Sequence, residues 1–370
     1  MNAKHLLMSL LCVVMPLAAG AYDFEVDGLY FNKTNEGEVS VVKGDKQYSG
    51  DVVVPTSITV DGVQYAVTAI GQQAFEFCAV NSIVLPEGLK RVEGYSLACQ
   101  AKEVNIPSTI EEIGHYAFAG GRFKDLRLPE GLRVIEDGAF EGTPVREVVI
   151  PSTVSSIGVE VFSGAGWDEA EANGPGFGLD HISVAEGNPY YDSREDCNAV
   201  IETATNKLVV GTNNTVIPSD VKVLGSCAFS YCNRMTKIII PASVEKIDIN
   251  CFLQCYKLTD IYVCRQEPAA APRAFGHPGL DGFDFDHVVL HVPMGCKDAY
   301  AAANTWSYFK NIVEFDPSNM SDPTGIGLQA VETTGGNTYY SADGKQLQSP
   351  QRGMNIVRQK NGTSVKVVVK

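Results

Sequence analysis

The sequence predicts a mainly β solenoid with coils of about 22 residues, and three observations support this prediction. First, the pattern Ile-Gly-x-x-Ala-Phe recurs, and its last position, an aromatic residue or Leu, falls at residues 75, 97, 118, 140, 162, 229 and 252. Second, an apolar-x-apolar-Pro pattern follows the same spacing, as in Val148 to Pro151 and Ile238 to Pro241. Third, 35 Gly and 18 Pro in 370 residues indicate many regularly placed turns. Two independent patterns in one register exclude a chance repeat.

Residues 1–21 have the features of a cleavable secretory signal. Lys4 precedes an apolar run from Leu6 to Ala19, and a small-residue cleavage site follows at Ala19 to Ala21. Because this run is too short for a spanning helix and no later stretch is apolar for long enough, we expect no transmembrane segment. We expect the mature chain to begin at Tyr22 and the protein to be secreted or exposed on the cell surface, with the periplasm as the alternative.

Each predicted coil consists of a short alternating strand, a corner marked by Pro, a second extended piece such as Ile110 to Ile113, and a tight Ala-Phe turn. A single coil cannot bury its apolar side chains alone. Neighbouring coils must therefore stack, so that equivalent Ile, Val, Leu and Phe residues form continuous buried columns.

The periodic pattern also sets the limits of the predicted domains. The solenoid is predicted over residues 69–315, after an N-terminal β cap at residues 22–68. The interval between Phe162 and Phe229 is 67 residues, three times the period. We therefore expect enlarged or degenerate coils at residues 163–217, which form either a binding loop or a tolerated bulge.

The segment Ile-Pro-Ser-Thr-Ile-Glu-Glu-Ile-Gly-His-Tyr-Ala-Phe, at residues 106–118, resembles the leucine-rich repeat of the BspA-like surface proteins of Bacteroidetes. Both flanks are similar to that family as well, in the segments 22–30 and 302–314. The resemblance implies a leucine-rich repeat solenoid with a β-rich N-terminal cap and a helical cap at residues 297–315. It also implies adhesion to other proteins as the function.

The tail differs from the repeat in composition. Asp316-Pro-Ser-Asn-Met-Ser-Asp-Pro opens a linker at residues 316–326. Residues 327–370 are predicted to form short strands of a small β domain, with turns at Gly335-Gly336, Asp343-Gly344 and Asn361-Gly362. This segment resembles the C-terminal β-sandwich sorting domains of exported Bacteroidetes proteins, which implies delivery to the cell surface.

The chain is acidic, with 44 Asp and Glu against 29 Lys and Arg and a formal net charge of −15. Such a surface repels phosphate groups, which argues against nucleic acid as a partner. Residues 345–370 contain six basic and no acidic residues, so the acidity is concentrated in the repeat domain. This charge favours a protein with basic patches as the partner.

Three cysteines occupy one position of the repeat, since Cys78, Cys232 and Cys255 each lie three residues after the Phe of the motif. Equivalent positions in stacked coils lie about 4.7–4.9 Å apart. These residues are therefore either a column of buried thiols or, for Cys232 and Cys255, a disulfide. Cys251 and Cys255 lack a second pair of ligands, so we expect no zinc site.

The sequence lacks the common catalytic and cofactor motifs: a G-x-S-x-G elbow, H-E-x-x-H, a P-loop, and G-x-G-x-x-G after a strand. His287 and His291 share one face of an alternating strand near Asp284 and Asp286. Two His and two carboxylates in such an acidic segment are usually solvated side chains. We therefore expect no enzyme activity, no cofactor and no metal, and keep a carbohydrate-active enzyme that uses residues 163–217 as a third alternative.

The candidate binding surface is the outward face of the predicted strands. Because side chains alternate along a strand, the residue between the two inward apolar residues of each motif points outward. These outward residues form a ladder, which consists of Val84, Asn105, Arg127, Val149, Ser183, Val216, Ile239 and Tyr262 and is flanked by Glu103, Asp125, Glu147, Lys237 and Asp260. The ladder has no run of stacked aromatic residues, which favours a protein partner over a glycan.

The predicted function is that of a monomeric, non-enzymatic, secreted or cell-surface repeat protein that binds a macromolecular partner through this ladder. The resemblance implies a host extracellular-matrix or plasma protein, or a bacterial surface protein, as the partner. The alternative is a structural component of the cell envelope or periplasm without an external ligand.

Overall fold

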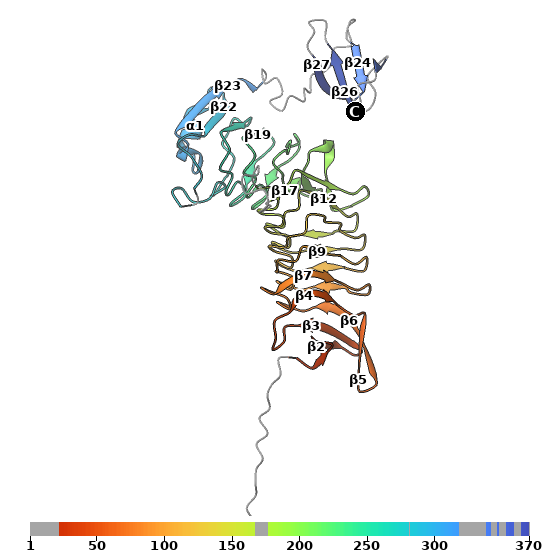
Figure 1. The fold of residues 1–370 in the computed structure, drawn as a ribbon. Coiled ribbons are helices and arrows are strands. Elements are labelled where there is room, and N and C mark those ends of the chain that lie inside the picture. Colours follow the sequence, from red (N-terminus) through yellow and green to blue (C-terminus); the bar gives the residue numbers. More distant parts are fainter. Residues whose placement is uncertain are drawn as a thin grey trace, which may run out of the picture.

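The computed structural model describes residues 22–166, 177–280 and 282–317, together with the backbone of four strands between residues 338 and 369. The described part before residue 318 is a long stack of coils (Figure 1). The predicted signal sequence and most of the predicted linker lie outside the described residues. None of the helices in the described ranges is long and apolar enough to cross a membrane.

The N-terminal part of the chain forms two β hairpins. The first consists of β1 (Phe24–Val26), β2 (Leu29–Asn35) and β3 (Glu38–Val42), and the second of β5 (Ser57–Val60) and β6 (Val63–Ile70). Asp61 and Gly62 connect β5 to β6 with φ values of 51° and 77°, as an Asp-Gly hairpin turn requires. β6 also pairs in parallel with β3 and with β8 (Arg91–Val92), so it joins the hairpins to the stack.

Two rows of parallel strands run along the stack. The first row, here called the strand face, consists of β4 (Ser49–Val53), β7 (Ala79–Val84), β9 (Glu103–Val104), β12 (Glu147–Ile150), β14 (His181–Val184), β19 (Lys237–Ile240), β21 (Asp260–Val263), β22 (Val289–Pro293) and β23 (Asn311–Phe315). The second row consists of β6, β8, β10 (Glu112–Ile113), β11 (Val134–Ile135), β13 (Ser156–Ile157), β18 (Val223–Leu224) and β20 (Lys246–Ile247). The predicted period is the register of these rows, since Ile113 pairs with Ile135, one period further along the chain.

The strand rows correct the predicted limit between cap and solenoid. The predicted boundary between residues 68 and 69 falls inside β6, which pairs with strands on both sides of it. The strand face already begins with β4, which pairs in parallel with β7. The stack therefore starts within the segment that the sequence assigns to the cap.

The Phe residues of the motif form the centre of the core. Their rings stack along the axis, with neighbouring centroids 5.2 to 5.5 Å apart, in two columns formed by Phe118, Phe140 and Phe162 and by Phe229, Phe252 and Phe275. Phe275 belongs to a coil that the sequence pattern missed, because Ala270 and Ala271 replace its Ile-Gly pair. The small residue before each Phe is buried as well, as at Ala117.

The segment between Phe162 and Phe229 separates the two Phe columns. It contains β14 and an antiparallel sheet of β15 (Tyr191–Asp192), β16 (Val200–Glu202) and β17 (Lys207–Val210), with η2 (Arg194–Asp196) between β15 and β16. The N–H of Gly211 donates to the carbonyl of Ala228 (2.8 Å), the bond that Phe118 makes to Ala139 in a regular coil. Gly211 thus takes the place of Phe in the column, in the interval where the sequence predicts enlarged or degenerate coils.

A short helix and a 3-10 turn follow β22. They are α1 (Lys297–Ala302) and η3 (Trp306–Tyr308). The indole N–H of Trp306 donates to the carbonyl of Ala269 (2.8 Å), and its ring lies 6.0 Å from that of Phe275. The predicted helical cap at residues 297–315 is wrong at its end. Residues 311–315 form β23, which extends the parallel sheet because its Ile312 is buried in the core.

Four strands of the tail form an antiparallel sheet in the order β25-β24-β26-β27. Their bounds are β24 (Thr338–Ser341), β25 (Gln346–Leu347), β26 (Gly353–Arg358) and β27 (Ser364–Val369). The predicted turn residues Asn361 and Gly362 lie between β26 and β27 in the sequence. The predicted β-sandwich needs a second sheet, and the described strands of the tail form one.

Candidate functional site

The predicted ladder points away from the core where the strand face is continuous. Val149 pairs with Ser183 between β12 and β14, and Ile239 pairs with Tyr262 between β19 and β21. The exposed fraction of Val149 is 56%, whereas that of its inward neighbour Val148 is 2%. The alternation predicted from the sequence is therefore present at these strands.

Three ladder residues lie differently from the prediction. Val216 is in no strand, because its N–H donates to the carbonyl of Cys197 within the enlarged segment (3.0 Å). Arg127 is also outside the strands, because its segment forms no strand pair with β9 or β12. Asn105 is exposed, but its amide bonds to the backbone of Leu85, from which it accepts at 2.7 Å and to which it donates at 2.8 Å. The amide of Asn105 thus ties two coils together.

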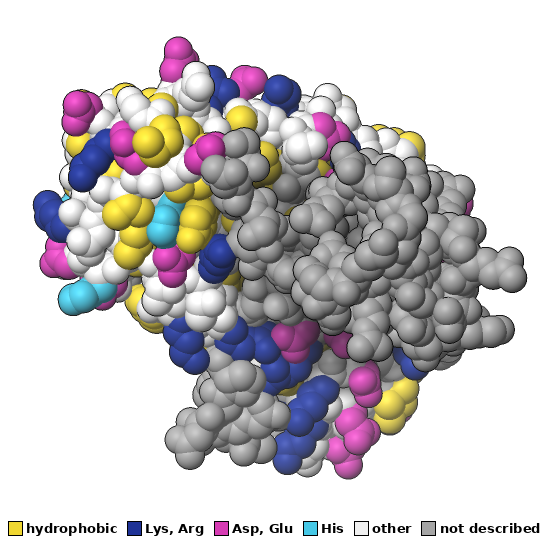
Figure 2. Space-filling model, turned by 90° about the horizontal axis from the view of Figure 1, so that it is seen from above, with side chains coloured by type: hydrophobic (Ala, Val, Ile, Leu, Met, Phe, Trp, Pro, Cys, Tyr) yellow, Lys and Arg dark blue, Asp and Glu magenta, His cyan; other side chains and the backbone are white. Residues whose placement is uncertain are grey.

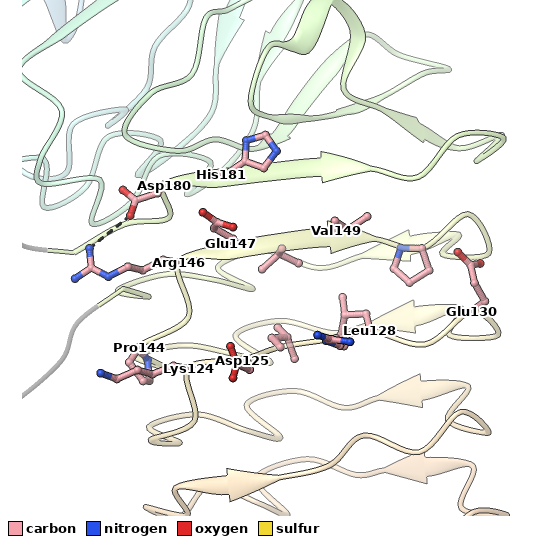
Figure 3. A pocket seen from close by; sticks show the side chains of 14 residues that line it. Lys124, Asp125, Leu128, Glu130, Pro144, Arg146, Glu147, Val149, Asp180 and His181 are labelled. Carbon is pink, nitrogen blue, oxygen red and sulfur yellow. Dashed lines mark hydrogen bonds and ion pairs between the residues drawn. The ribbon is translucent and has the colours of Figure 1, made fainter. Parts of the chain in front are cut away.

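The interruption of the strand face at Arg127 coincides with a groove of about 650 Å³ (Figure 3). A smaller hollow of about 260 Å³ adjoins it on the side of β9. Leu126 and Leu128 line the groove and are half-buried, whereas the equivalent residues of the next coil, Val148 and Ile150, have exposed fractions of 2% and 0%. The coil without strand pairing therefore exposes apolar surface to the groove.

Charged side chains of both signs line the same groove, namely Lys124, Asp125, Arg127, Glu130, Arg146, Glu147 and Asp180. Asp180 pairs with Arg146 at 3.5 Å and with Arg234 at 2.6 Å. Asp125 and Glu147 come from neighbouring coils (Figure 3), and within the described part of the chain neither carboxylate has a hydrogen bond or an ion pair. The groove therefore combines exposed apolar side chains with carboxylates that are free to bind a ligand.

The second half of the strand face carries an aromatic cluster that the sequence analysis missed. The ring of His291 stacks on that of Tyr262, with centroids 3.9 Å apart, and Phe315 lies edge-on to Tyr262 at 5.4 Å. His291 Nε2 is 2.8 Å from a carboxylate oxygen of Asp260, and the ammonium of Lys237 lies 4.6 Å from the Tyr262 ring centre. The view of Figure 2 shows a histidine between hydrophobic side chains on this end of the molecule. The signal for this cluster was the pairing of His291 with Tyr262, two coils apart in an irregular part of the repeat.

The electrostatics of this cluster are internally balanced. Burial alone raises the pKa of Asp260, but hydrogen bonds from His291 and Thr259 and the charges of His291 and Lys237 outweigh it. The pKa of Asp260 consequently lies below its ordinary value of 3.8. The polar groups of this half of the strand face are thus engaged with one another.

The two histidines considered as metal ligands lie apart in their contacts. His287 Nδ1 is 2.9 Å from Asp284 on its own loop, and this hydrogen bond raises the pKa of His287. His291 instead contacts Asp260 on β21. In the described ranges, no group of three or more His, Cys, Asp or Glu residues is placed to hold a metal ion.

The cysteines of the shared repeat position are buried free thiols. Cys78, Cys232 and Cys255 have exposed fractions of 5%, 3% and 1%. The predicted disulfide between Cys232 and Cys255 is wrong, because the Cys255 S–H donates to the carbonyl of Phe229 (3.1 Å) and its sulfur is directed at backbone. Burial raises the pKa of Cys232 to about 12 and that of Cys255 well above its ordinary value of 9.0.

Comparison with solved structures finds leucine-rich repeat proteins at low identity. The chain is 15% identical to the pneumococcal vaccine antigen PcpA, covering 78% of this chain and 96% of that one, with a TM-score of 0.48. It is 16% identical to a leucine rich cell surface protein from Faecalibacterium prausnitzii (80% and 95% covered, TM-score 0.44). It is 19% identical to a leucine-rich repeat protein from Bacteroides ovatus (80% and 77% covered, TM-score 0.47). A comparison with curated proteins finds no match.

A family model gives a more specific result. The model described as "BspA type Leucine rich repeat region" matches residues 56–166 and 206–290 in 6 copies, which is more than half of the chain. The match confirms the repeat resemblance and does not include the tail, whose likeness to sorting domains stays a prediction. The chain therefore belongs to the family of proteins with a BspA-type leucine-rich repeat region.

Proposed function

We propose that this protein is a non-enzymatic repeat protein that binds a protein partner through the groove on its strand face. The observation that supports this most is the interrupted coil at Leu126 to Leu128, which exposes apolar side chains next to Val149 and two free carboxylates. Protein interfaces combine an apolar centre with a polar rim, as this groove does. Leucine-rich repeat solenoids commonly use such an extended strand surface for recognition.

The groove is the centre of a larger surface in this proposal. A stable protein interface buries roughly 800 Å² on each partner, which is more than a groove of this size provides. The in-register residues beyond both ends, Val84 and Ser183, lie on the same face and extend the surface. The second half of the ladder is less suited to the role, since Lys237, Asp260 and His291 are already engaged with one another and with Tyr262.

The proposal includes the location of the protein. A signal at residues 1–21 and a sorting-like tail at residues 327–370 lead to secretion or display on the cell surface, with the periplasm as the alternative. The expected partner is a host extracellular-matrix or plasma protein, or a bacterial surface protein, bound by a monomer. A Bacteroidetes origin accords with the motifs that carry the resemblance.

The test measures binding of the mature chain, from Tyr22 onward, to a panel of purified extracellular-matrix and plasma proteins and to intact bacterial cells. The variant Val149→Arg places a charge in the groove at a position that is 56% exposed, so the fold tolerates it. The matched control is Val313→Arg, on β23 at the far end of the same face, where the exposed fraction of Val313 is 42%.

The expected result is that a protein bound by the wild type loses about tenfold or more in affinity with Val149→Arg and is bound normally by Val313→Arg. Equal binding by all three proteins contradicts the groove as the site. A wild type that binds no member of the panel favours the alternative, a structural component of the cell envelope.

A further inference from the structure

We infer that the partner presents basic side chains to three carboxylates on the strand face, those of Glu103, Asp125 and Glu147, here called the acidic row. This inference rests on the proposed function of the groove and goes beyond it by naming the chemistry of the partner. Two members of the row, Asp125 and Glu147, line the groove itself.

The three residues hold one position on three successive coils. Each directly precedes an inward residue of its coil, namely Val104, Leu126 or Val148. Glu103 pairs with Ser82 in the strand ladder, and Glu147 pairs with His181. All three side chains are exposed. Strand spacing places neighbours in such a row about 4.8 Å apart, so the row is a line of like charges that repel one another.

Elsewhere along the stack, carboxylates are neutralised across coils. Glu111 pairs with Lys90 at 2.8 Å, and Glu245 pairs with Lys222 at 3.4 Å. The acidic row differs from these pairs, because none of its members has a hydrogen bond or ion pair in the part of the chain that the structure describes. The row thus lacks, within the described coils, the counter-charge that the same fold supplies at other positions.

The nearest cations do not fill this role. Lys124 and Arg146 each precede a member of the row, lie at the start of the coil segments and have other interactions, for Arg146 an ion pair with Asp180. Arg127 lines the groove two residues after Asp125, beyond the row. A partner that complements this surface therefore needs cationic groups over the acidic row and an apolar group over Val149.

An extended peptide segment fits these requirements. Side chains on one face of an extended strand repeat at about 6.7 Å, and the row spans two coil steps of about 4.8 Å each, so two basic side chains reach it together. Lys and Arg both qualify, because each can bind carboxylates on neighbouring coils. The inferred partner is consequently a protein with an exposed basic segment.

The test uses two labelled ten-residue probes, one of alternating lysine and serine and one of alternating glutamate and serine. Binding is measured with the mature chain, with the triple variant Glu103→Gln, Asp125→Asn, Glu147→Gln, and with a control triple variant of equal charge change. The control replaces exposed glutamates elsewhere by Gln, at Glu25, Glu36 and Glu267. All six positions are exposed, so both triple variants are expected to fold, and circular dichroism checks this.

The expected result is that the row variant weakens binding of the lysine probe by about tenfold and the control variant by less than about twofold. Equal weakening by both variants overturns the inference, because it shows attraction to the net charge alone. Tighter binding of the glutamate probe than of the lysine probe overturns it as well. A partner that requires Val149 but is bound normally by the row variant refutes this inference and leaves the proposed function intact.

Discussion

Replacement of Phe140 by Ala tests the stacked core from which the strand face is built. The Phe140 ring is fully buried between those of Phe118 and Phe162, with centroid separations of 5.3 and 5.5 Å and interplanar angles of 7° and 8°. The substitution removes one ring from the middle of the column. The surrounding coils are fixed by their parallel strand pairs and cannot close the gap fully.

The expected loss of stability follows from these contacts. A buried Phe→Ala substitution lowers the free energy of unfolding by about 3–5 kcal/mol, through lost transfer free energy and a residual cavity. Each aromatic pair contributes about 0.5–1.5 kcal/mol beyond its buried area. Because Phe140 has such a contact on each side, we expect a loss of about 4–5 kcal/mol.

Urea unfolding of the mature chain, followed by far-ultraviolet circular dichroism, measures this loss. Phe77→Ala is the matched control, because Phe77 is 81% exposed and lies in a turn of the same repeat. Its substitution is expected to change the free energy of unfolding by less than about 0.5 kcal/mol. A loss below about 1 kcal/mol for Phe140→Ala, or an equal loss for both variants, refutes the inward phase assigned to the repeat.

Three further predictions test other parts of the structure. Gly211→Ala is expected to lower the melting temperature, with a loss of about 1–3 kcal/mol, because its Cβ would lie 2.2 Å from the Phe229 ring; calorimetry that finds unchanged melting contradicts the place of Gly211 in the column. The depressed pKa of Asp260 stabilises the fold above its ordinary pKa of 3.8, and this contribution is lost as the pH falls through the lower folded pKa; unfolding midpoints measured from pH 5 to pH 2 are therefore expected to fall less for Asp260→Asn than for the wild type, and parallel curves would show that Asp260 is not coupled to His291. Burial raises the thiol pKa values of Cys232 and Cys255, so mass spectrometry after iodoacetamide treatment is expected to find both unmodified in the native protein and modified after denaturation; a mass shift showing a Cys232–Cys255 disulfide would contradict the free thiols.

The fold was largely predictable because its signal is periodic. The Phe position recurs with a constant spacing, and the pairing of Ile113 with Ile135 is that spacing in three dimensions. The prediction failed where the chain departs from the period. Gly211 fills a Phe position with no side chain, and Phe275 lacks the Ile-Gly pair, so neither has a local motif.

The candidate site was predictable in direction but not in detail. Strand alternation correctly placed Val149 outward, and it extended the same rule to Arg127 and Val216, which lie in no strand. Strand pairing depends on backbone hydrogen bonds with neighbouring coils, which an outward side chain does not reveal. The groove at Leu126 arises from that missing pairing, and the aromatic cluster at Tyr262 arises from contacts across coils.

Hydrogen exchange of the mature chain, with and without a protein partner from the binding panel, tests the central claim most directly. Since the strand-face groove is the proposed site, we predict slower exchange on binding at residues 103–105, 124–128 and 146–149. Exchange elsewhere on the stack, including β21 and β22, is predicted to stay unchanged. Protection confined to the second half of the strand face, or to the turns that carry the Phe residues, would contradict the claim.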